Sequence, residues 1–246
     1  MSIGSDRDLA GLRAAGRAVA EALEEMRDAV RPGVATRELD EIGAGVFARH
    51  GARSAPQLVY GFPGVNCISV NEEAVHGIPS QRCLRDGDVV TLDATAELGG
   101  YMADAAITVT AGEAPAEAVA LVETAERALA RALRLVRAGV RLNALGRAIQ
   151  AEVEEAGFNV IPALSGHGIG ETIHEPPVVA NYYDAYDTTV LTEGLVLTIE
   201  PVVAAGCGDV VVEDDGWTVV TADRSLVAHA EHTVVVTSSE PFVLTA

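Results

Sequence analysis

The sequence predicts an α+β protein whose two similar halves form one structural unit. Within its 246 residues, LRDGDVVTLD at 84–93 matches LTEGLVLTIE at 191–200, and ADAAITVT at 103–110 matches AEHTVVVT at 230–237. These matched segments are rich in β-branched residues, as strands are, and helix-like periodicity precedes them in both halves. The period is too long for a solenoid, so we expect a pseudo-two-fold unit in which the acidic strands meet at the pseudo-axis.

Each half is expected to begin with two helices. In the first half these are predicted at residues 6–30 and from Thr36, as N-cap, to Gly51; both have an apolar stripe at helical spacing, which includes Met26. Their counterparts are expected at about 115–137 and 143–156, because RPGVATRELDEIGAGVFARHG at 31–51 aligns with RAGVRLNALGRAIQAEVEEAG at 137–157. We therefore expect a single domain, residues 1–246, with pseudo-repeat halves of about 1–112 and 113–246.

Residues 84–110 are expected to form a β-hairpin that turns at Gly99-Gly100. Asp93 and Asp104 lie on opposite arms, so the hairpin could bring them together, although each could instead only cap the turn. The repeat places Glu200 opposite Asp93 and Glu231 opposite Asp104. Four carboxylates in an apolar setting repel one another unless cations lie between them. The repeat therefore favours a shared metal site.

Histidines offer further ligands. His167 and His174 lie in the glycine-rich segment SGHGIGETIHEPP at 165–177, which contains no basic residue for a phosphate site, and imidazoles beside carboxylates suit a metal. His76, in a loop before Gly77, is weak evidence by itself. The remaining histidines, His50, His229 and His232, are expected to have no chemical role. Glu231 lies between the last two and is expected to face inward.

An oxygen-rich ligand set with one imidazole suits Mn, Fe or Co, with Zn as a further option. Two divalent cations would neutralise four carboxylates and still hold a hydroxide. Such pairs, about 3.5 to 4 Å apart, lower the pKa of bound water and polarise the attacked group. The sequence therefore predicts hydrolysis as the reaction class.

Composition excludes several functions. The 17 basic residues are all arginine, and with 36 acidic residues the net charge is −19. Without lysine there can be no Schiff-base lysine, pyridoxal phosphate site or P-loop, and the acidic surface argues against DNA binding. Three cysteines form no CxxC motif, no apolar run is long enough to span a membrane, and residues 1–11 lack a signal layout. We expect a cytoplasmic protein with no disulfide and no membrane association.

Five motifs, CISVNEEAVHGIP, DGDVVTLD, GHGIGETIHEPP, LTIEP and AEHTVVVT, together resemble type I methionine aminopeptidases of peptidase family M24. The resemblance covers nearly the whole chain. It implies the pita-bread fold, with two pseudo-symmetric halves around a central antiparallel sheet and helices on the outer face. It also implies two divalent metal ions and removal of the N-terminal methionine from nascent proteins when the second residue is small, by attack of a metal-bound hydroxide on the first peptide bond.

The resemblance assigns a role to each matching position. Asp93 would bind one metal and His167 with Glu200 the other, while Asp104 and Glu231 would bridge the pair. His76, His174 and Glu200 would be catalytic. His76 would contact the scissile amide nitrogen and His174 the carbonyl oxygen, so both would also bind substrate, while Glu200 would be the proton shuttle. The walls of the methionine pocket would be Phe62, Cys67 and Trp217.

Some positions depart from the family pattern. Val59 and Ile173 stand where aromatic residues are common, which would leave more room in the pocket, although a flexible thioether still fits an aliphatic wall. One alternative is a related M24 aminopeptidase of other specificity, such as Xaa-Pro; many of these carry another histidine where this chain has Glu171. A further alternative is a non-catalytic binding protein, which would typically have lost metal ligands.

The expected partners follow from this resemblance. The protein would act on the N-termini of peptides and nascent proteins, as a monomer. The resemblance also implies transient contact with the ribosome, for which the acidic, lysine-free composition is poorly suited electrostatically.

Overall fold

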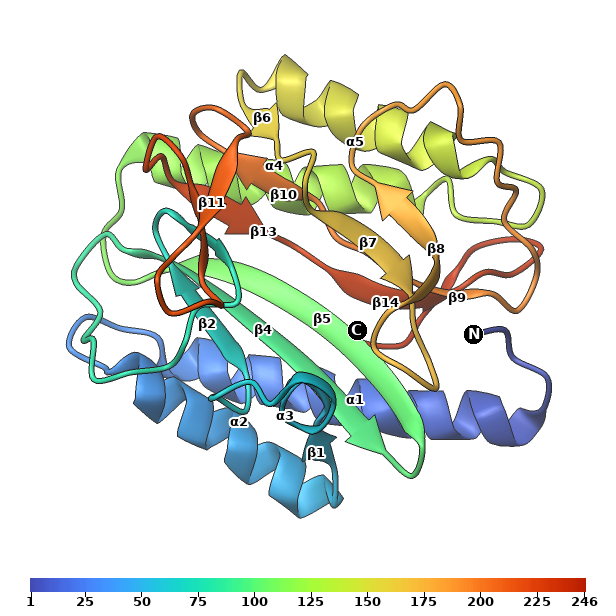
Figure 1. Ribbon diagram of the computed structural model, residues 1–246, viewed down its shortest axis with the longest axis horizontal. Helices are drawn as coiled ribbons and strands as arrows, with labels where there is room; N and C mark the ends of the chain where they lie inside the picture. Colours follow the sequence, from blue (N-terminus) through green and yellow to red (C-terminus); the bar gives the residue numbers. More distant parts are fainter.

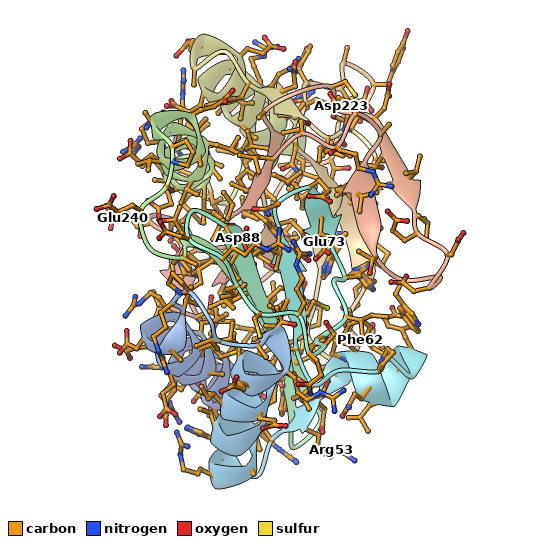
Figure 2. All side chains as sticks on the ribbon, turned by 90° about the vertical axis from the view of Figure 1, so that its left-hand side faces the viewer. Arg53, Phe62, Glu73, Asp88, Asp223 and Glu240 are labelled. Atoms are coloured by element: carbon orange, nitrogen blue, oxygen red, sulfur yellow. The ribbon has the colours of Figure 1, made fainter.

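The computed structural model describes residues 1–246 as five helices and a set of antiparallel strands. Figure 1 shows the two halves as similar units, with α1 and α2 along one side, α4 and α5 along the other, and long strands between them. Turned by 90°, Figure 2 shows α1, α2 and α4 on one side of the strands, and α3 with the labelled Phe62 on the opposite side. The long helices therefore cover one face, while the short α3 lies on the other (Figure 2).

The first half builds a four-stranded sheet in which β4 pairs with β1, β2 and β5. Its centre is the β4–β5 hairpin, which pairs without interruption from Val89↔Thr110 to Leu98↔Tyr101. The elements of this half are α1 (Asp6–Ala29), α2 (Thr36–His50), β1 (Arg53–Ser54), α3 (Ala55–Tyr60), β2 (Cys67–Val70), β3 (Glu73–Val75), β4 (Val89–Leu98) and β5 (Tyr101–Thr110).

The second half builds a five-stranded sheet with the order β15-β14-β9-β7-β8. Two smaller sheets, β13-β10-β6 and β11-β12-β3, flank it. The elements of this half are α4 (Ala116–Leu133), α5 (Leu142–Glu155), β6 (Asn159–Val160), β7 (Ser165–Gly168), β8 (Glu175–Ala180), β9 (Val196–Ile199), β10 (Val202–Ala204), β11 (Val210–Val212), β12 (Val219–Thr221), β13 (Val227–His229), β14 (His232–Val235) and β15 (Phe242–Val243).

Two helix ends differ from the sequence prediction. Ala35, and not Thr36, is the N-cap of α2, because the Glu38 carboxylate accepts the Ala35 N–H at 3.0 Å while the Thr36 hydroxyl is engaged with Ser80. Helix α4 ends at Leu133 and does not reach residue 137. The chain tightens there into three-residue turns, such as Leu135 N–H to Ala132 C=O, before the positive-φ Gly139.

Each half has its own apolar core between its helices and its sheet. In the first half α1 buries its apolar stripe against β4 and β5, and Met26 is fully buried there, as predicted. In the second half Leu121 of α4 and Ile149 of α5 occupy the corresponding core. Because each helix pair is fixed by burial of a continuous apolar face, the strand ends that it supports are held rigidly.

Hydrogen bonds join the two halves beside the pseudo-axis. The Glu231 N–H donates to the Ala106 carbonyl at 2.8 Å. The Thr233 hydroxyl accepts the Asp104 N–H at 2.9 Å and donates to the Asp104 carbonyl at 2.6 Å. The strand segments that carry two of the predicted metal ligands are therefore tied directly to each other.

Two further predictions concern membranes and disulfides. None of the five helices combines the length and the apolarity needed to cross a lipid bilayer. The three cysteines, Cys67, Cys83 and Cys207, are free thiols.

Candidate active site

The β4–β5 hairpin brings Asp93 and Asp104 together. In the ladder Asp93 pairs with Ala106 and Asp104 with Thr95, so the two aspartates are diagonal neighbours on one face of the sheet. Their carboxyl groups lie close enough to shift each other's pKa. They converge and do not cap the turn, because the hairpin turns at Gly99-Gly100, well beyond them.

The second half contributes Glu200, Glu231 and His167. Glu200 directly follows β9 and Glu231 directly precedes β14, and the β9–β14 pairing of Ile199 with His232 places both at the same end. His167 lies on the neighbouring β7, with its Nε2 3.5 Å from Glu200 Oε1. One ligand atom each of Asp104, His167 and Glu231 lies within 4.8 Å of the others. Candidate metal ligands from both halves thus meet at one point.

Burial makes the ionised carboxylates costly. It raises the pKa of Asp104 to about 6 and that of Glu200 to about 8. Burial, followed by repulsion from the neighbouring carboxylates, raises the pKa values of Asp93 and Glu231 well above their ordinary range. Oδ1 of Asp104 and Oε1 of Glu231 are buried and have no hydrogen-bond partner. A positive charge among these groups would offset the repulsion and satisfy both oxygens.

The donor set fits divalent cations. Carboxylate oxygens with one imidazole suit Mn, Fe, Co or Zn. Burial lowers the pKa of His167 to about 4, so its imidazole is neutral. Its Nδ1 lies 2.9 Å from the Gly168 carbonyl and therefore donates, which leaves the Nε2 lone pair free for a metal. The Thr198 hydroxyl donates to Glu200 Oε1 at 2.7 Å and orients that carboxylate.

A hollow of about 280 Å³ opens onto Asp93 and Asp104. All three predicted wall residues line it, together with Ile173: Phe62, Cys67 and Trp217. The Phe62 and Trp217 rings meet edge to face, with centroids 5.3 Å apart and an interplanar angle of 81°, an arrangement that packs aromatic rings favourably. The hollow therefore joins an apolar end, with one sulfur, to an anionic end.

His76 and His174 stand between this hollow and a second one of about 460 Å³, which His167 and Glu200 also line. Burial lowers the pKa of both histidines, and the nearby His174 lowers that of His76 further. His76 has a positive φ of 60°, which is costly for a residue with a side chain. Gly77 fixes this loop, since a Cβ there would lie 2.4 Å from the Ile68 carbonyl oxygen.

Residues 10–238 match the model of metallopeptidase family M24. The chain belongs to this family. As an M24 metallopeptidase it is an enzyme, and the matched range includes every site residue described above.

This M24 chain is similar over its whole length to methionine aminopeptidases. It is 44% identical to methionine aminopeptidase 2 of Bacillus subtilis over 247 residues, which cover 100% of this chain and 99% of the relative. The crystal structure of the methionine aminopeptidase from Thermotoga maritima matches with a TM-score of 0.96 and 37% identity, covering 100% of this chain and 99% of the other. The family resemblance and the pita-bread fold class predicted from the sequence are confirmed.

A more distant M24 neighbour shares the fold alone. The prolidase from Pyrococcus furiosus matches with a TM-score of 0.80 at 23% identity, covering 99% of this chain and 65% of that one.

The M24 site contains an aromatic residue that the sequence does not indicate. Val59 is 45% exposed and does not line the hollow, so its side chain does not narrow it, and the extra room expected from the missing ring stays a prediction. Helix α3 instead turns the next residue, Tyr60, into the lining, where its hydroxyl lies 2.6 Å from Nδ1 of His174. Nothing in the sequence around Tyr60 signals a partner 114 residues away.

His229 also lies closer to the site than predicted. His229 was expected to have no chemical role, but it ends β13 two residues before Glu231, which lies in the link between β13 and β14. His229 is 2% exposed, with Nε2 3.6 Å from Glu231 Oε2, and burial lowers its pKa to about 3. It is therefore a neutral neighbour of this carboxylate. His232, in contrast, pairs with the Thr245 hydroxyl at 2.9 Å.

Proposed function

We propose that the protein is an aminopeptidase that removes methionine from the N-termini of peptides and nascent proteins whose second residue is small, using two divalent cations. The observation that carries this proposal is a buried group of carboxylates with one neutral imidazole, two of its oxygens unpartnered, at the end of an apolar hollow. The names of the full-length relatives, which are methionine aminopeptidases, support it.

Asp93 would hold one cation, His167 with Glu200 the other, and Asp104 with Glu231 would bridge the two. Four carboxylates carry −4 when ionised, which two divalent cations balance. When bound, such a pair supplies positive charge to the reacting groups and lowers the pKa of water at the site. Mn, Fe, Co and Zn all suit these ligands.

Glu200 would move the proton. Its Oε1 accepts the Thr198 hydroxyl, which leaves Oε2 to take a proton from the attacking water and to deliver it to the leaving amine. Its carboxylate lines the larger hollow beside His76 and His174. The attacking water, which gives up the proton, and the leaving amine, which receives it, would both lie in this hollow.

The two loop histidines would act as neutral hydrogen-bonding groups. His174 would donate to the carbonyl oxygen of the scissile bond, where negative charge develops in the transition state. His76, held by its positive-φ loop, would contact the amide nitrogen. Both line the hollow that would receive the side chain.

The lining of the hollow favours a thioether side chain. Cys67 provides a polarisable sulfur, Ile173 an aliphatic wall, and the Phe62–Trp217 pair aromatic edges. Methionine is flexible and makes favourable contacts between its sulfur and aromatic rings. Its side chain therefore suits this mixed surface better than a charged or short one.

The test is hydrolysis of a matched peptide set that begins with Met-Ala, Met-Leu, Leu-Ala or Ala-Pro, using metal-free protein before and after Mn²⁺ or Co²⁺ is added. We expect metal-dependent release of the first residue from Met-Ala alone. Cleavage of Ala-Pro would favour an Xaa-Pro aminopeptidase, and cleavage of Leu-Ala a broader specificity. No cleavage with any metal would favour a binding protein.

A further inference from the structure

One hydrogen bond crosses the mouth of the substrate hollow between the two halves of the chain. The Tyr60 hydroxyl lies 2.6 Å from Nδ1 of His174, and the ring centroids are 5.8 Å apart at 41°. Tyr60 is the last residue of α3, and His174 directly precedes β8. Both line the hollow that opens onto Asp93 and Asp104. The contact is therefore part of the site, and it forms only when the two halves are assembled.

The chemistry of the two groups sets the direction of this hydrogen bond. A phenol carries its proton up to a pH of about 10, whereas a neutral imidazole has one nitrogen with a lone pair. The favoured arrangement has the Tyr60 O–H donating to Nδ1 of His174. A neutral ring whose Nδ1 accepts must carry its proton on Nε2. The contact thus selects one of two tautomers.

No other hydrogen bond holds the His174 ring. The loop backbone is fixed by Glu175, whose Oε1 accepts the N–H groups of Glu171 and Thr172, each at 3.0 Å. The Thr172 hydroxyl donates to the His174 carbonyl at 3.3 Å and to Glu175 Oε1 at 3.5 Å, and so does not reach the ring. The ring itself packs against His167, with centroids 4.3 Å apart. Packing limits where the ring lies, but only Tyr60 distinguishes one ring nitrogen from the other.

We propose that Tyr60 is a positioning residue, whose hydroxyl holds His174 in the tautomer that presents an Nε2–H donor to the carbonyl oxygen of the scissile bond. This inference rests on the proposed function, since that reaction requires a donor where negative charge develops. The opposite tautomer would present a lone pair to the developing oxyanion and would oppose the reaction. Tyr60 acts through His174 and touches no reacting atom in this role.

The test replaces Tyr60 by phenylalanine, which keeps the ring and removes the hydroxyl. Tyr186→Phe is the matched control, because Tyr186 is 94% exposed in the loop between β8 and β9. The tautomer of His174 is read by ¹⁵N NMR of metal-free protein labelled in its histidine rings, with a His174→Gln sample to assign the signals. We expect an Nε2–H ring in the wild type and in Tyr186→Phe, and a mixture of tautomers in Tyr60→Phe.

Kinetics on a Met-Ala peptide should also distinguish Tyr60→Phe from the wild type and from Tyr186→Phe. We expect kcat of Tyr60→Phe to fall roughly three- to ten-fold with little change in KM, the size set by one neutral hydrogen bond used in the transition state. An Nδ1–H ring in the wild type, or an unchanged tautomer and kcat in Tyr60→Phe, would overturn the inference. A wild-type protein that cleaves no peptide would instead overturn the proposed function, and the NMR spectra identify that case separately.

Discussion

Replacing Asp104 by asparagine is expected to lower peptidase activity by at least about a hundred-fold while the protein stays folded. Asparagine has nearly the same shape but no charge, so it would be a poor ligand for the cations that we propose Asp104 and Glu231 share. Oδ1 of Asp104 has no hydrogen-bond partner in the protein, and burial raises its pKa. Loss of this charge should therefore maintain or increase the stability of the metal-free protein. Steady-state hydrolysis and urea unfolding measure the two effects.

Asp88→Asn is the matched control, with the opposite pattern expected. Asp88, labelled in Figure 2, is another buried aspartate of the first half. Its carboxylate accepts the Arg85 N–H at 2.8 Å and the Asn71 side-chain amide at 2.9 Å. Asparagine cannot accept both as well, so stability should fall by about 1–3 kcal/mol while activity is retained. Full activity in Asp104→Asn would rule out a role for that carboxylate in the reaction.

The metal-free protein is expected to lose stability as the pH rises from about 5.5 to 8, and to regain it when a divalent cation is added. The folded-state pKa values of Asp104, about 6, and Glu200, about 8, lie above the values of about 3.9 and 4.3 for unfolded chains. The folded state therefore binds more protons than the unfolded state in this interval, and its stability falls as these groups ionise. The expected loss is on the order of 3 kcal/mol.

Chemical unfolding at several pH values, with a chelator or with excess Mn²⁺, measures this effect. Saturating metal should recover roughly 3–4 kcal/mol, because it binds the folded state and needs ionised ligands. The unfolding free energy of the Asp104→Asn protein should depend less on pH. This comparison distinguishes the effect of the site carboxylates from the general effect of a net charge of −19. Stability that is independent of both pH and metal would show that these carboxylates are not a metal-dependent cluster.

The sequence predicted the site carboxylates and the fold class because both follow from regular residue spacing. The alternation of strand residues and the Gly99-Gly100 turn bring Asp93 and Asp104 together, and the repeat extends the argument to Glu200 and Glu231. Two periodicities, one for strands and one for helices, thus predict the fold class and the carboxylates. Burial of these groups follows from the same patterns, since the strands that carry them are apolar.

Contacts across the pseudo-axis could not be predicted in this way. Tyr60 ends a helix of only six residues, too short for periodicity to reveal its direction, and its partner lies in the other half. His229 was given no role although it lies two positions before Glu231, a spacing that places two side chains on one face of a strand; their contact also depends on the link between β13 and β14. The N-cap of α2 could not be predicted for a similar reason. Thr36 is a residue type that often caps helices, but its hydroxyl instead donates to the Ser80 carbonyl, 44 residues away.

The most direct test of the proposed dinuclear metal centre is the number of Mn²⁺ ions that the metal-free protein binds, measured by equilibrium dialysis and compared with Met-Ala hydrolysis by the same samples. We predict two ions per chain at saturation, with activity rising as they bind and with weaker binding in Asp104→Asn. Full activity in the presence of a strong chelator, with no retained metal, would contradict the assignment of Asp93, Asp104, His167, Glu200 and Glu231 as a metal centre.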